Sequence, residues 1–115
     1  MKTTASVDIP EHPVDDPAAK DVFMRMLVGP ADGAPNFFLR RFRICPGGHT
    51  PRHQHPWEHE VFVLSGEGEA CSDQGGRLIA AGSVVFIPAG EIHQFKNTGH
   101  TDLEFLCIVP ASSAR

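Results

Sequence analysis

The sequence of 115 residues contains no tyrosine, a single tryptophan and only three cysteines, Cys45, Cys71 and Cys107. An odd number of cysteines at wide, unrelated spacing argues against a disulfide framework and favours a reducing compartment. No apolar segment approaches the roughly 18 residues that a membrane span needs, and the first residues lack the apolar core of a secretory signal. We therefore expect a cytoplasmic protein with no membrane partner.

Basic residues are also few and dispersed. Lys and Arg number 10 against 14 Asp and Glu, which gives a formal net charge of -4, and no stretch of the chain concentrates the basic ones. The sequence therefore predicts no basic patch that could bind nucleic acid or an anionic membrane surface. The length suits one domain with a single core.

Turn-forming residues are abundant, with eleven Gly and ten Pro. They separate short segments rich in Val, Ile, Leu and Phe. Short apolar segments with turn signals between them are typical of an all-β sandwich or barrel. The expected strands are Phe37–Ile44, Glu60–Gly66, Ser83–Pro88 and Asp102–Val109.

Three further segments complete the expected organisation. Asp73–Gly76 is typical of a hairpin turn between two strands, and Lys20–Gly29 is a strand or a short helix, with its alternation favouring a strand. Residues 1–20 are expected to form an arm that is flexible or ordered by a second subunit. Residues 21–110 then form the barrel and residues 111–115 a tail.

The stretch HQHPWEHE, from His53 to Glu60, is dense in possible metal ligands. If His53 and His55 lie on a strand, they share a face and can both reach one ion. A further donor is expected from the residues just after Pro56. A fourth should come from another strand, and His93, which follows a Pro-x-Gly turn, is the candidate.

The spacing of these residues resembles both motifs of the cupin superfamily. The first motif is Gly, five residues, His-x-His, three or four residues, Glu, six residues and Gly, and here it begins at Gly47. The second motif is matched at every position. Its residues in this sequence are Gly82, Pro88, Gly90, His93 and Asn97. Together the two motifs span about half of the chain.

The first motif departs from the family pattern at the third ligand. Glu60 has the four-residue spacing after His55 but leaves only five residues before Gly66. His59 has the three-residue spacing after His55, and the six residues that the family pattern requires separate it from Gly66. Alternation along a strand also turns His59 inward with Val61 and Glu60 outward. We therefore predict a metal site of four histidines: His53, His55, His59 and His93.

The chain also resembles a smaller group of single-domain cupins whose four-histidine site holds manganese. This resemblance implies a single-domain, jelly-roll β-barrel with a divalent metal at its centre. It also implies a homodimer that can exchange N-terminal strands. Manganese is the expected metal, and because neutral imidazoles are borderline donors, Fe, Co, Ni, Cu and Zn are alternatives.

Three residues are candidates for the pocket beside the metal. Arg40 alternates in phase with Phe38 and Phe42, and a buried cation needs a partner, so Arg40 is expected to anchor an anion. The alternative is that Arg40 reaches the barrel mouth and stays solvated. Phe105 and Cys107 share a face of the last strand and either line the same cavity or only pack in the core.

We expect a divalent-metal-dependent oxidoreductase, either a dioxygenase or a peroxide-using enzyme, that acts on a small organic substrate, anionic in character. The absence of tyrosine and of a second carboxylate pair for acid–base work favours metal-centred redox chemistry. Two alternatives stay open: a metal-assisted lyase or isomerase, and a non-catalytic cupin that binds a small molecule through its metal.

Overall fold

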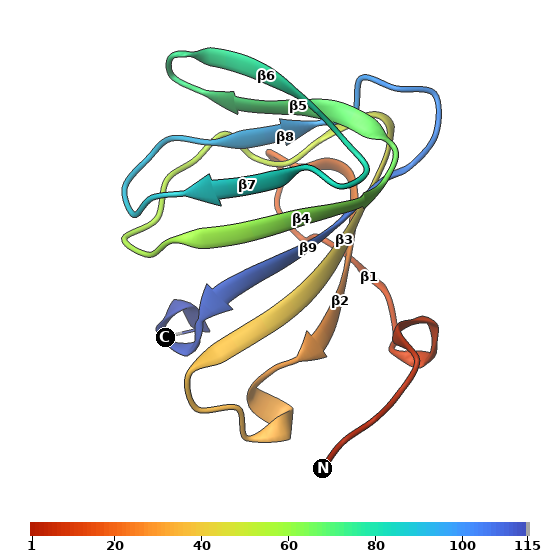
Figure 1. Ribbon diagram of the computed structural model, residues 1–115, viewed down its shortest axis with the longest axis vertical. Coiled ribbons are helices and arrows are strands. Elements are labelled where there is room, and N and C mark those ends of the chain that lie inside the picture. Colours follow the sequence, from red (N-terminus) through yellow and green to blue (C-terminus); the bar gives the residue numbers. More distant parts are fainter. Residues whose placement is uncertain (115) are drawn as a thin grey trace.

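The computed structural model describes residues 1–114, whose strands form one curled nine-stranded sheet, a half-open barrel (Figure 1). The strand order is β6-β5-β8-β3-β9-β4-β7, and β2 and β1 are added beside β3. The strands are β1 (His12–Pro13), β2 (Lys20–Val28), β3 (Phe37–His49), β4 (His59–Ser65), β5 (Glu67–Ser72), β6 (Gly75–Ala80), β7 (Val84–Ile87), β8 (Gln94–Lys96) and β9 (Leu103–Pro110). Short 3-10 turns at Ser6–Asp8, Pro30–Asp32 and Ala111–Ala114 are the remaining elements of the described residues. The all-β class is confirmed.

The expected strands are present, with shifted ends. The strand that was expected to stop at Ile44 continues to His49, and its last residue pairs with Lys96 of β8. The N-terminal segment with ambiguous periodicity is a strand, β2, which pairs antiparallel with β3. The β5–β6 hairpin is confirmed, but Gly75 already pairs with Ser72, so the turn is shorter than expected.

The core lies inside the curl, where alternate side chains of the strands meet. On β9 every second residue from Leu103 to Val109 is buried, and on β4 Val61 and Val63 are buried while Phe62 between them is exposed. This period of two is what a sheet with one solvated face requires. Within the described residues, no helix is both long and apolar enough to cross a membrane.

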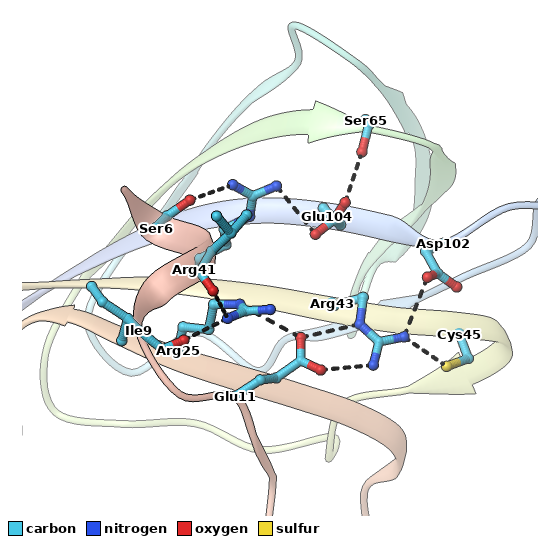
Figure 2. A network of polar contacts seen from close by, with 11 residues as sticks. Ser6, Ile9, Glu11, Arg25, Arg41, Arg43, Cys45, Ser65, Asp102 and Glu104 are labelled. Atoms are coloured by element: carbon cyan, nitrogen blue, oxygen red, sulfur yellow. Dashed lines mark hydrogen bonds and ion pairs between the residues drawn. The ribbon is translucent and has the colours of Figure 1, made fainter. Parts of the chain in front are cut away.

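The segment before β1 lies against the outer face of β2 and β3, where three arginines hold it (Figure 2). Arg43 forms a bidentate pair with Glu11, with distances of 2.8 and 3.1 Å from its Nη2 and Nε, and the bond from Arg43 lowers the pKa of the Glu11 carboxyl. Arg25 donates to the carbonyl of Ile9, and Arg41 donates to Ser6. The division into arm, barrel and tail stays a prediction, and residue 115 lies outside the described residues.

The expectation that His53 and His55 lie on a strand is wrong. Only His53 is paired, in an isolated antiparallel bridge with His93, and the chain around it is irregular. Pro51 and Pro56 lack the N–H group that a continuous ladder needs. The two imidazoles are brought together by this bridge and by a bond from the Gly90 N–H to the carbonyl of His55, at 2.7 Å.

Candidate functional site

A cavity of about 170 Å³ opens inside the barrel, and all seven residues predicted from the sequence line it. The four histidines come from the irregular segment before β4, from the start of β4 and from the residue before β8. Arg40 comes from β3, and Phe105 and Cys107 come from β9. The remaining walls are mostly apolar, so a ligand inside would be largely removed from water.

The histidines form a close group of three with a fourth beside it. Ligating atoms of His53, His55 and His93 lie within 4.8 Å of one another. The ring of His59 has its centre 4.9 Å from that of His93 and 5.3 Å from that of His55. Three imidazoles at this separation fit a transition-metal ion. His59 lies outside the close group, so its role as fourth ligand stays a prediction.

His59 and His93 are oriented by neighbours at their Nδ1 atoms. The Nδ1 of His93 lies 2.9 Å from the carbonyl oxygen of Glu91, which can only accept, so Nδ1 carries the proton. The Nδ1 of His59 lies 3.4 Å from the sulfur of Cys107. The Nε2 of His59 is buried and has no hydrogen-bond partner among the described residues. A buried nitrogen without a partner is costly, and a bound metal would satisfy it.

Burial keeps the imidazoles of His53, His55 and His59 neutral. Loss of solvation is the largest cause of a lowered pKa at all three of these histidines. The pKa of His53 is lowered, that of His55 is lowered to about 4 and that of His59 to about 3. The neighbouring histidines and the charge of Arg40 lower these pKa values further. Neutral imidazole is the form that binds a metal, so these three rings are ready to act as ligands at neutral pH.

Arg40 is the cation of the cavity. Its Nη2 donates to the sulfur of Cys107 at 3.2 Å, and its guanidinium carbon lies 4.9 Å from the centre of the Phe42 ring. Its Nε is buried without a partner, and no carboxylate of the described residues pairs with it. Burial raises the pKa of the Cys107 thiol, against the charge of Arg40. The thiol therefore stays neutral and does not cancel the charge of Arg40.

Two further residues line the site or border it. Asp16, from the turn before β2, lines the cavity. Trp57, the only tryptophan, is stacked on His55 with ring centres 4.5 Å apart. Nothing in the local sequence around Asp16 points to the site, because β1 and β2 must first pair to carry this turn to the cavity.

Asn97, which the second motif includes, has a structural role. It is buried and its Nδ2 donates to the carbonyls of Ile44 and Thr101, both at 2.8 Å. Its Oδ1 accepts from the N–H of Gly99 at 2.9 Å. These bonds satisfy backbone groups of β3 and of the turn after β8, and Asn97 is not part of the cavity lining.

Curated relatives match the part of the chain that forms the site. The oxalate-binding protein of Thermotoga maritima is 40% identical over 70 residues, which are 60% of this chain and 58% of that protein. The 1-methylthio-D-xylulose 5-phosphate methylsulfurylase of Rhodospirillum rubrum is 37% identical over 73 residues, which are 64% of this chain and 47% of that enzyme. The chain thus spans about half the length of the curated relatives it matches.

Solved structures match nearly the whole fold. The polyketide cyclase RemF of Streptomyces resistomycificus superimposes with a TM-score of 0.92 at 37% identity, over 96% of this chain and 80% of that one. A predicted oxalate decarboxylase of Thermotoga maritima superimposes with a TM-score of 0.84 at 31% identity, over 95% of this chain and 98% of that one. The family described as "Cupin domain" matches residues 40–109. The half-open barrel is thus the expected jelly roll, and the chain belongs to the cupin family.

Proposed function

We propose that the protein is a divalent-metal-dependent cupin that acts on a small organic anion. The metal would be held by His53, His55, His59 and His93, and the anion would also contact Arg40. The observation that carries this proposal is a pair of buried nitrogens without partners beside one cavity, Nε2 of His59 and Nε of Arg40. The first fits a metal, and the second belongs to a cation that a bound anion would neutralise.

Manganese is the metal we propose, with Fe, Co, Ni, Cu and Zn as alternatives, since neutral imidazoles suit all of them. When bound, the metal supplies a Lewis acid or a redox partner for the organic anion. The chain's own residues would orient and desolvate that anion. Arg40 would hold its charge, and Phe42 and Phe105, whose rings stack with centres 5.3 Å apart, would exclude water.

Three functions are compatible with this site. Oxidation of the anion by dioxygen or peroxide is the one we propose first. A metal-assisted lyase or isomerase reaction is the second, and the 37% identity to a polyketide cyclase supports a reaction without net oxidation. Non-catalytic capture of an anion is the third, and the likeness to an oxalate-binding protein supports it. Oxygen or peroxide consumption by the metal-loaded protein with candidate substrates separates the first class from the others.

Replacing Arg40 by glutamine is expected to weaken the binding of oxalate to the metal-loaded protein by roughly thirtyfold or more, because a desolvated charge pair is lost. Isothermal titration calorimetry on the Mn-loaded protein measures this change, and metal analysis should show unchanged metal content. Arg52→Gln, at an exposed position outside the cavity lining, is the matched control. Equal oxalate affinity in the Arg40 variant and the wild type would contradict the anion contact.

We also propose a homodimer formed through the outer face of β4, β7 and β9. Phe62, Val84, Phe86 and Ile108 expose apolar side chains there, and Phe62 pairs with Val84 across the two strands. Contiguous exposed apolar surface of this kind marks an interface. In sedimentation velocity the wild type should be a dimer and Phe62→Glu a monomer, whereas Leu78→Glu, on β6, should stay a dimer. A monomeric wild type at tens of micromolar would rule out this interface.

A further inference from the structure

Two opposite charges line the same small cavity. Arg40 and Asp16 are the arginine and the carboxylate among its lining side chains, within the described part of the chain. They come from elements far apart in the sequence, β3 and the turn before β2. A cavity of about 170 Å³ has room for roughly six non-hydrogen atoms, if each takes about the volume of a water molecule in the liquid. A single compact ligand that fills this cavity would therefore lie beside both residues.

The two charges reach the cavity from different elements. Arg40 of β3 is bonded to Cys107, and Cys107 in turn contacts His59 at 3.4 Å. Asp16 belongs to the turn between β1 and β2, and Val14 and Val22 beside this turn also line the cavity. The cavity therefore carries a cation and a carboxylate on separate elements.

The carboxylate of Asp16 is held in place by its own turn. Its Oδ1 accepts from the N–H of Ala18 at 2.8 Å, and its N–H donates to the carbonyl of Val14 at 3.0 Å. The turn is tied to β2 by a bond of 2.9 Å from the Val14 N–H to the carbonyl of Val22. Asp16 is exposed, so it lies on the open side of the cavity that it lines. It would face whatever enters the cavity from that side.

We propose that Asp16 sets the substrate class of this site, selecting small monocarboxylates that carry a hydroxyl or amino group over compact dicarboxylate dianions. The inference rests on the proposed function. The carboxylate of the ligand would lie toward Arg40 and the metal, and its hydroxyl or amino group would donate to Asp16. A dianion would bring its second carboxylate toward that of Asp16, and two like charges about 4 Å apart repel by about 1 kcal/mol even in water.

The test compares oxalate, glycolate and acetate binding to the Mn-loaded protein by the fluorescence of Trp57, which stacks on His55. Asp16→Asn keeps the oxygen that accepts from Ala18 but removes the charge. Its neighbour Asp15→Asn is the control, since Asp15 is exposed and does not line the cavity. We expect the Asp16 variant to bind oxalate about tenfold more tightly and to lose the preference for glycolate over acetate, with the Asp15 variant unchanged.

Two results would overturn the inference, and they differ. In the first, the wild type binds these anions only with metal and with Arg40 intact, but Asp16→Asn leaves the oxalate affinity and the glycolate preference unchanged. Asp16 then does not select the substrate class, and the proposed function stands. If none of the anions binds the wild type in a metal-dependent manner, the proposed function fails and the selectivity fails with it. Metal content is measured in each sample, so that loss of metal to oxalate is not read as weak binding.

Discussion

The variant His59→Ala should lose nearly all of its metal under conditions in which the wild type stays loaded. Its metal affinity should be lower by roughly a hundredfold or more, because one of the four ligands is removed. Glu60→Gln is the matched control and should keep its metal. Competition with a chromophoric chelator, together with elemental analysis, measures both. Metal retained by the His59 variant and lost by the Glu60 variant would reverse the assignment.

The two side chains differ because β4 alternates. His59 is 6% exposed and faces the cavity, while Glu60 is exposed and its Cα partners are Phe86 and Ile108 on the neighbouring strands. A hydrogen bond with Glu58 raises the pKa of the Glu60 carboxyl, so the two glutamates interact with each other on the outside. For Glu60 to reach the cavity, β4 would have to shift by one residue, which would expose Val61 and Val63.

The metal-free protein should lose stability as the pH falls below about 6.5. The pKa is lowered to about 4 for His55 and to about 3 for His59 in the folded state, whereas the unfolded chain binds these protons near pH 6.5. Between these values the unfolded state holds more protons, so the free energy of unfolding decreases as the pH decreases. For buried His59 the loss is on the order of 2 kcal/mol between pH 6.5 and 5.

Urea denaturation of the metal-free protein at pH 7, 6 and 5 measures this loss. The variant His59→Gln carries no proton at this position and should show a shallower dependence on pH. Saturating metal should stabilise the protein at pH 7, and the gain should shrink as protons displace the ion. Equal pH dependence in the wild type and the His59 variant would show that His59 is not the buried neutral base described above.

Much of the site follows from spacing and alternation, and the rest depends on long-range pairing. The period of two along β3 and β4 predicts that Arg40 and His59 face inward, and the structure has both beside the cavity. The route by which His53 and His55 meet was not predictable, since it depends on a single bridge to His93 rather than on a strand. The contact of His59 with Cys107 needs the pairing of β4 with β9.

Asp16 is a clearer example of a site residue whose position depends on long-range pairing. Its neighbours in sequence are Pro, Ala and Asp, a composition typical of any surface turn. The pairing of His12 with Met24 and the ion pair of Glu11 with Arg43 help to carry it to a cavity whose histidines and arginine lie more than 20 positions away. The folded site therefore contains a carboxylate that the local sequence pattern did not reveal and that could serve in acid–base chemistry.

The binding of one divalent ion by four histidines inside this barrel is tested most directly by a crystal structure of the manganese-loaded protein, with anomalous diffraction data that locate the metal. We expect one metal peak in the cavity, with Arg40 beside it and Glu60 on the outer face. The ligands of this metal should be nitrogens of His53, His55, His59 and His93. A peak ligated by Glu60 in place of His59, or no metal in the cavity of fully loaded protein, would contradict it.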